Sequence, residues 1–210
     1  MAWTSINISI KIAALECGDY HSMLLSDEGD LFACGRSDKY QLGLPGTDSV
    51  AEFKRVPIKD KVKLISCGTN HSIFITVNND IYATGDNSYF QITPKKKEIL
   101  KKPEKIKLDA LKGKKIKDIS CGCKFFTVVL CKLQFSTDQH TIYMTEEGNL
   151  FCYGNNSFGQ LNISLVGINK AGEGQLVETV TCGSYHTFVV TDKGQVWACG
   201  KVCFLKSIHS

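Results

Sequence analysis

The sequence predicts an all-β fold, an incomplete β-propeller of about three to four blades. A Cys-Gly pair recurs four times along the chain, at 17–18, 67–68, 121–122 and 182–183. A turn motif follows each pair, and a short strand with an aromatic residue follows each turn. Self-similarity of this kind is the sequence signature of a repeat architecture.

The spacing inside the repeats is nearly constant. A turn residue lies three positions after a Ser or Thr in all four copies, and a closing Gly lies six positions further on. The turn residues are Gly29, Asn79, Gly148 and Gly194, and the closing glycines are Gly35, Gly85, Gly154 and Gly200. The Ser or Thr lies eight positions after Gly18, Gly68 and Gly183, but 23 after Gly122, which indicates an insertion of 15 residues in the third copy.

The segments around these markers have the composition of β-strands. Apolar residues, mostly β-branched, stand two and five positions before the Cys, as Leu15 and Ile12 do in the first copy. Short apolar segments flanked by Gly predict strands. The segments after the turns, "LFAC", "IYAT", "LFCY" and "VWAC", are apolar or small on both faces. Such strands suit a sheet that is covered on both sides, as a propeller blade is.

The turns are predicted to be tight hairpins. A three-residue hairpin loop needs one residue at positive φ, and Gly adopts it without strain. Asn79 replaces Gly in the second copy, and Asn is among the few other residues that tolerate this conformation.

The stretch "GNNSFGQL" at 154–161 has relatives at 35–43 and 85–93, where Gln41 and Gln91 match Gln160. No helical pattern follows any of the three, so we interpret them as blade connections and not as phosphate-binding loops.

We expect residues 1–210 to form one repeat domain. The predicted repeats span 12–61, 62–115, 116–176 with the insertion at 130–144, and 177–200 as a partial copy, followed by a diverged tail at 201–210. In this alignment Phe125 stands in the third copy where the other copies have His.

The combined motif resembles the repeat of the regulator of chromosome condensation family. Gly-x-x-His-Ser/Thr carries the resemblance at Gly18 and His21, at Gly68 and His71, and at Gly183 and His186; the four turns and 154–161 complete it. The family implies seven-bladed propellers, and its members include exchange factors for small GTPases, chromatin-binding proteins and modules of ubiquitin ligases or kinases. Three repeats and part of a fourth fit a fragment or a self-standing arc.

The repeated histidines and cysteines are interpreted as structural. His21, His71 and His186 share one repeat position, which suits a repeated hydrogen bond inside or between blades. Seven of the ten cysteines occupy strand positions, where free Cys behaves as a small buried apolar residue. Cys123, Cys131 and Cys203 complete no zinc-binding pattern, so we expect neither a metal nor a cofactor.

The basic character of the chain is concentrated in one segment. Residues 95–117 carry a net charge of +8 in a chain of net charge +4. Candidate contacts there are Lys95, Lys96, Lys97, Lys101 and Lys102. The segment could bind nucleic acid or another anionic surface; the alternative, which we favour, is a solvated loop.

The insertion at 130–144 is the second candidate binding element. Asp138 and His140 could contact a partner, because long excursions from a rigid scaffold often carry binding function. Leu133, Phe135, Ile142 and Tyr143 alternate in a way that suggests a projecting hairpin, which some exchange-factor relatives use to reach the GTPase. The alternative is a longer hairpin that packs on its own blade.

The sequence contains no Ser-His-Asp set, no paired carboxylates and no nucleotide loop. We therefore favour a non-catalytic protein-interaction module in regulation or signalling. The alternatives are guanine-nucleotide exchange on a small Ras-like or Ran-like GTPase, which works by shifting binding equilibria, and chromatin or nucleic-acid docking through 95–117.

No apolar stretch is long enough to span a bilayer, and the N-terminus lacks the features of a secretory signal. A cytoplasmic or nuclear protein is the expectation. The two open blade faces of a partial propeller would favour self-association.

Overall fold

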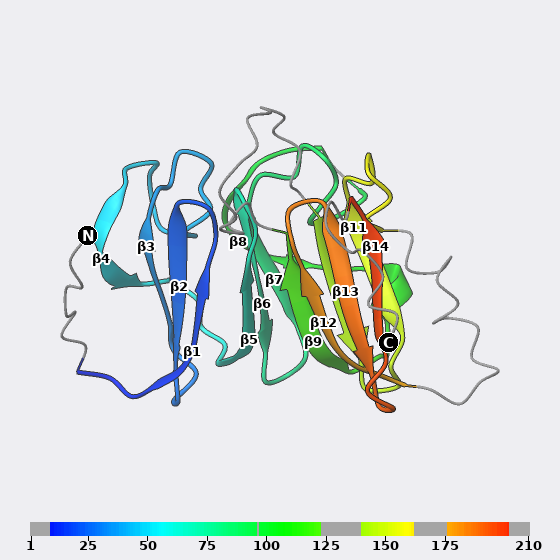
Figure 1. Ribbon diagram of the computed structural model, residues 1–210. Coiled ribbons are helices and arrows are strands. Elements are labelled where there is room, and N and C mark those ends of the chain that lie inside the picture. The colour runs from blue at the N-terminus through cyan, green and yellow to red at the C-terminus, as the bar shows by residue number, and fades with distance from the viewer. Residues whose placement is uncertain (1–8, 96, 123–139, 162–175, 202–210) are drawn as a thin grey trace, which may run out of the picture.

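The computed structural model describes residues 9–95, 97–122, 140–161 and 176–201. Within them the chain forms fourteen strands and one short 3-10 turn (Figure 1). The strands form four small antiparallel sheets, two of four strands and two of three, each built from one repeat. The all-β, incomplete propeller predicted from the sequence is confirmed.

Each sheet is a simple meander. Blade 1 contains β1 (Ile12–Cys17), β2 (His21–Ser26), β3 (Leu31–Gly35) and β4 (Val50–Arg55), and blade 2 contains β5 (Val62–Cys67), β6 (His71–Thr76), β7 (Ile81–Gly85) and β8 (Leu100–Ile106). The 3-10 turn η1 (Asp109–Leu111) leads to blade 3, with β9 (Ile116–Cys121), β10 (His140–Thr145) and β11 (Leu150–Gly154). Blade 4 contains β12 (Val177–Cys182), β13 (His186–Thr191) and β14 (Val196–Gly200).

The blades stand side by side in an arc. The first strands of successive blades, β1, β5, β9 and β12, are in contact from one blade to the next and line the inner side of the arc. The hairpins that join the second and third strands lie at the lower end of Figure 1. The loops that follow the third strands lie at the opposite, upper end.

The hydrophobic core is divided into three clusters, one at each junction between blades. At the first junction Met23 and Leu25 of blade 1 pack with Val62, Ile65 and Phe74 of blade 2. The same repeat positions form the clusters at the second and third junctions. In an internal blade, one face of the sheet lies in the junction with the preceding blade and the other in the junction with the next blade. Both faces of its strands must therefore be apolar, as the sequence indicates.

A close contact explains why a Gly recurs beside the histidine of each blade. A Cβ atom built on Gly18, Gly68, Gly122 or Gly183 would overlap the ring of the histidine of the same blade. The Gly N–H also donates to the backbone carbonyl of that histidine, at 2.9 Å from Gly68 to His71. Only a residue without a side chain allows the imidazole to lie this close to the turn.

The histidine ring then reaches the next blade. His21 Nε2 lies 2.8 Å from Ser72 Oγ, and His71 Nε2 lies 3.0 Å from Thr141 Oγ1. Ser72 Oγ in turn donates to the Gln41 carbonyl at 2.8 Å. Because a hydroxyl has one hydrogen to donate, the Ser72 oxygen must accept from His21, which fixes the Nε2–H tautomer of that ring.

Burial keeps these rings neutral. Desolvation lowers the pKa of His21 and of His140 to about 4, and that of His71 to about 3. Neighbouring histidines make a smaller contribution to the lowered pKa of His71 and of His140. The Nδ1 atoms of His21 and His71 have no hydrogen-bond partner in the described part of the chain. A proton there would create a buried donor without an acceptor, which disfavours the charged ring.

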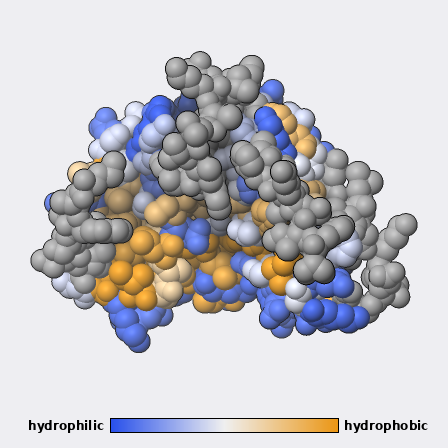
Figure 2. All heavy atoms as spheres, viewed as in Figure 1, coloured by the Kyte–Doolittle hydropathy of each residue, from blue (hydrophilic) through white to orange (hydrophobic). Residues whose placement is uncertain are grey.

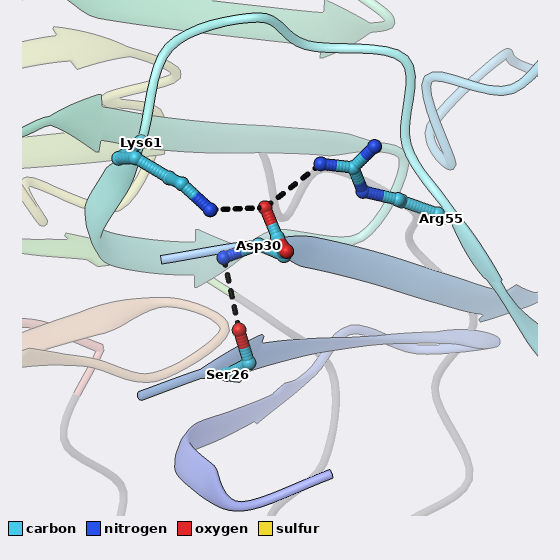
Figure 3. Close-up of polar contacts among 4 residues, drawn as sticks. All are labelled: Ser26, Asp30, Arg55 and Lys61. Atoms are coloured by element: carbon cyan, nitrogen blue, oxygen red, sulfur yellow. Dashed lines mark hydrogen bonds and ion pairs between the residues drawn. The ribbon is translucent and has the colours of Figure 1, made fainter. Parts of the chain in front are cut away.

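Hairpin turns and ion pairs stabilise the lower end of the arc. Asn79 adopts a φ of 67°, the left-handed conformation that the sequence analysis expects of it. At the first hairpin the Asp30 N–H donates to Ser26 Oγ, and the Asp30 carboxylate accepts from Arg55 at 2.9 Å and Lys61 at 2.8 Å (Figure 3). The bonds from Lys61 and Arg55 lower the pKa of Asp30. Lys61 directly precedes β5, so this carboxylate ties blade 1 to the start of blade 2.

The third repeat differs from the alignment expected from the sequence. His140, and not Phe125, occupies the repeat position: it pairs with Gly154 as His21 pairs with Gly35 and His71 with Gly85. The placement of an insertion at 130–144 is therefore wrong at its C-terminal end, because 140–144 form the fully buried strand β10. The extra residues fall between Gly122 and His140, outside the described residues.

A different count would have found this register. Five positions separate His from the Ser or Thr that opens the turn in copies one, two and four, and five separate His140 from Thr145. Counting forward from Gly122 instead reaches Phe125, which is followed by an apolar stretch that looks like a strand. The suggestion that Ile142 and Tyr143 belong to a projecting hairpin is also wrong, since neither side chain is exposed.

Gly68→Ala is expected to lower the free energy of unfolding by about 1–3 kcal/mol, the usual cost of overpacking. The added methyl group would collide with the His71 ring. Urea denaturation measures the change. In a His71→Ala background the same substitution should cost clearly less, and an equal cost in both backgrounds would contradict the contact.

Stability should depend on pH in a direction set by the neutral histidines. The unfolded chain binds protons below an ordinary histidine pKa of about 6.5, whereas the folded rings do not until pH about 4 or 3. The contribution of the neutral rings to the free energy of unfolding is therefore complete above about pH 6.5. It falls as the pH is lowered, by up to about 1.4 kcal/mol per pH unit for each ring.

The measurement is the urea midpoint at pH 7.5 and at pH 5.0, with His71→Gln as the comparison. The midpoint should be lower at pH 5.0, and the variant should show a smaller difference between the two values. Identical midpoints at both pH values would show that the rings titrate normally in the folded protein.

Candidate partner-binding surfaces

The upper end of the arc, which we name the loop face, carries the connections 36–42, 86–92 and 155–161 (Figure 1). One buried glutamine fixes each connection. Gln41, Gln91 and Gln160 have no exposed surface, and their Oε1 atoms accept the N–H two residues upstream at 2.9 Å. The carbonyls of Gln41 and Gln160 also accept from the hydroxyls of Ser72 and Thr187 in the following blade. The loops are thus rigidly placed.

Two aromatic residues on these loops are held in a strained conformation. Tyr40 has a φ of 60° and Phe90 a φ of 58°, whereas the matching residue of blade 3 is Gly159, with a φ of 75°. The left-handed region costs a residue with a Cβ roughly 1–2 kcal/mol. Backbone strain of this kind gathers at functional sites and persists where the surroundings enforce it. The candidate residues chosen from the sequence include neither Tyr40 nor Phe90, although alignment with Gly159 would have found both.

Aromatic side chains are concentrated on the loop face, and several carry a cation. Tyr20, Tyr89 and Phe90 are exposed, at 60%, 42% and 42%. Arg36 lies over the Tyr20 ring at 5.4 Å, Lys101 over Tyr40 at 5.9 Å, and Lys201 over Phe158 at 5.2 Å. Aromatic and arginine side chains on a rigid surface are the residue types that dominate binding energy at protein interfaces.

A cavity of about 440 Å³ lies on the inner side of the arc. Its lining includes Cys17, Cys67, Cys121 and Cys182 from the four first strands. Desolvation raises the pKa of Cys67 and Cys182, and that of Cys121 to about 12, so these thiols are protonated and poor nucleophiles or metal ligands. No group of three or more His, Cys, Asp or Glu is placed to hold a metal ion within the described ranges.

The lysine segment is part of the fold and not a separate loop. Lys101 and Lys102 lie on β8, the edge strand of blade 2, while Lys95 and Lys97 lie in the connection before it, and Lys96 is outside the described residues. Lys95 pairs with Asp109 at 3.2 Å, and Lys105 with Asp80 at 2.6 Å. Lysines and Pro103 on an edge strand prevent further strand pairing, which gives the segment a structural role.

The structure describes only one of the two candidate residues of the insertion. Asp138 lies outside the described residues. His140 is completely buried in β10, against Gly122, and its pKa is lowered by burial. It is therefore not available to a partner, and it belongs with His21 and His71 in the blade junctions.

The chain belongs to the family defined by the regulator of chromosome condensation (RCC1) repeat. One model of this repeat matches residues 12–41, 62–91, 136–160 and 177–201, and a second matches 28–75. The third match includes His140, in agreement with the register of β10.

Known proteins with similar sequences have different functions. The chain is 31% identical over 205 residues to the human probable E3 ubiquitin-protein ligase HERC6, a match that covers 91% of this chain and 18% of that protein. It is 38% identical over 45 residues to the Saccharomyces cerevisiae guanine nucleotide exchange factor SRM1, covering 21% of this chain and 9% of the other. The chain thus spans less than a fifth of either relative.

The fold is similar to that of a solved yeast protein. The crystal structure of Prp20p from Saccharomyces cerevisiae, reported with its binding properties to Gsp1p and histones, superposes with a TM-score of 0.71 at 19% identity. The match covers 93% of this chain and 46% of that one. In the described part of this chain no helix is long and apolar enough to cross a membrane.

The strain at the loop face can be tested by comparing neighbouring residues. Tyr89 and Phe90 are equally exposed, but only Phe90 has a positive φ. Phe90→Gly relieves strain of about 1–2 kcal/mol and adds a backbone entropy cost of about 0.5–1 kcal/mol, so stability should be unchanged or rise by up to about 1.5 kcal/mol. Tyr89→Gly adds the entropy cost without relieving any strain, so it should destabilise the protein. The urea midpoints of the two variants measure these changes. Equal destabilisation by both substitutions would contradict backbone strain at Phe90.

Proposed function

We propose that the chain is a non-catalytic protein-interaction module that binds a protein partner through the loop face. The observation that carries the proposal is the pair of strained aromatic residues, Tyr40 and Phe90, on loops that buried glutamines hold in place. Glycine would fit both backbones better, so a benefit outside the fold offsets the strain.

The polar groups of the repeat support a role without chemistry. The histidines of blades 1 and 2 are buried and neutral, and each bonds a hydroxyl of the next blade. Burial raises the pKa of the Cys67 and Cys121 thiols on the inner side of the arc, which keeps both protonated. A match to 18% of a ubiquitin ligase is consistent with a recognition part that brings one protein to another, in the cytoplasm or the nucleus.

The partner experiment uses the strained residues against a matched control. Partners captured by the wild-type chain are compared with those captured by Tyr40→Gly/Phe90→Gly, and by Val77→Asn, which alters an exposed residue at the opposite end of the arc. Loss of hot-spot side chains should weaken capture about tenfold or more, while Val77→Asn should have no effect. Equal capture by all three proteins would exclude the loop face.

Guanine-nucleotide exchange is the second candidate. It is favoured by the match to SRM1 and by the likeness to Prp20p, whose reported binding includes Gsp1p. The test is the rate of labelled GDP release from Gsp1p with and without the chain. The scaffold proposal predicts no acceleration. Acceleration that Asp138→Ala abolishes would instead support exchange through the insertion; a change at His140 would report on folding, because that ring is buried.

Docking of chromatin or nucleic acid through 95–117 is the third candidate. It predicts binding of duplex DNA that falls steeply between 50 and 200 mM salt, because phosphate contacts release counterions. Partner binding through aromatic residues of the loop face should change little over that range. Replacing Lys97 and Lys102, both exposed, with Gln should weaken DNA binding only if this third function exists.

A further inference from the structure

The two ends of the arc expose repeat positions that are buried at every internal junction. Ile12 and Leu15 of β1 are 47% and 55% exposed, whereas the matching Val62 and Ile65, Ile116 and Ile119, and Val177 and Val180 are buried. On β14, Val196 is 64% exposed, whereas Leu31, Ile81 and Leu150 at the same position are buried. Figure 2 shows apolar residues gathered over the region of β1.

The two open faces are complementary to each other. At the internal junctions the second and third strands of one blade pack against the first and second strands of the next. Blade 4 exposes the face formed by its second and third strands, which includes Val196. Blade 1 exposes the face formed by its first and second strands, which includes Leu15. Each face therefore has the apolar pattern that the other one packs against inside the arc.

Polar groups at the two ends match in the same way. Inside the arc His21 and His71 bond the hydroxyl that follows the histidine of the next blade. The open face of blade 4 carries the half-buried ring of His186. The open face of blade 1 carries Ser22 of β2, in the position that Ser72 and Thr141 occupy in blades 2 and 3. Likewise Ser66 and Ser120 accept from the backbone N–H of Cys121 and Cys182, and exposed Thr181 stands in their position for Cys17.

We propose that a second copy of this chain closes the arc, with blade 4 of each copy packed on blade 1 of the other. Leu15 and Ile12 would pack against Val196, and His186 would bond Ser22, at two equal junctions. The match to a solved propeller covers 46% of that chain, so two copies supply roughly the material of one ring.

The geometry of such a ring is within the known range. Two copies of four blades give eight, and propellers close with about four to eight blades. If each blade turns as in the seven-bladed propellers that the family resemblance implies, the rotation per blade must decrease by about 6° to fit eight. A head-to-tail contact that closes on itself gives a discrete dimer, and one that does not close gives filaments. The proposal does not depend on the loop face, which both copies leave open.

The first test is the solution mass of the full chain, measured by light scattering over a range of concentrations. The expected mass is twice the 23.2 kDa of one chain. Leu15→Glu and Val196→Glu should each give a monomer at concentrations where the wild type is a dimer. Val77→Glu, at a site 58% exposed and on neither face, should remain a dimer.

Mixing the two variants gives the sharpest result. The unmodified blade 4 of Leu15→Glu can pack on the unmodified blade 1 of Val196→Glu, so the mixture should regain a dimer that neither variant forms alone. Both residues are exposed within one copy, so each variant should keep the circular dichroism spectrum of the wild type. A monomeric wild type, filaments, an oligomer unaffected by both substitutions, or no recovery on mixing would overturn the proposal.

Discussion

The contact that joins one blade to the next determines most of this structure. At the first two junctions a histidine ring lies against a glycine of its own blade and reaches a hydroxyl of the following blade, as His71 does between Gly68 and Thr141. The apolar clusters stabilise the junctions, but they are not directional. The histidine bond fixes how one blade is oriented on the next, and burial keeps the ring neutral, so that it can donate without a buried charge.

The sequence predicted the features that depend on fixed spacing. The all-β propeller class and the first residues of the repeats, Ile12, Val62, Ile116 and Val177, could be read from it, since each follows from local pattern. The third copy could not be aligned from Gly122 alone, because two strand-like segments competed for one position. The backbone pairs His140 of β10 with Gly154 of β11, which places His140 at that position. Non-local pairing decided a choice that local propensity left open.

The candidate binding surface was harder to predict. Residues 95–117 stood out by charge and the insertion by length, yet Lys101 and Lys102 lie on the edge strand β8 and His140 is core. Tyr40 and Phe90 did not stand out, because their distinguishing property is a backbone angle and not a residue type. Only the comparison with Gly159 at the same loop position shows that two aromatic residues occupy a conformation suited to glycine.

The most direct measurement is the protonation state of the histidine rings, by 15N NMR of the folded chain between pH 7.5 and pH 5.0. The junction geometry predicts that His21 carries its proton on Nε2 and that His21 and His71 remain neutral throughout this range. Rings that take up a second proton near pH 6.5, or a proton on Nδ1 of His21 at neutral pH, would contradict the junction described here.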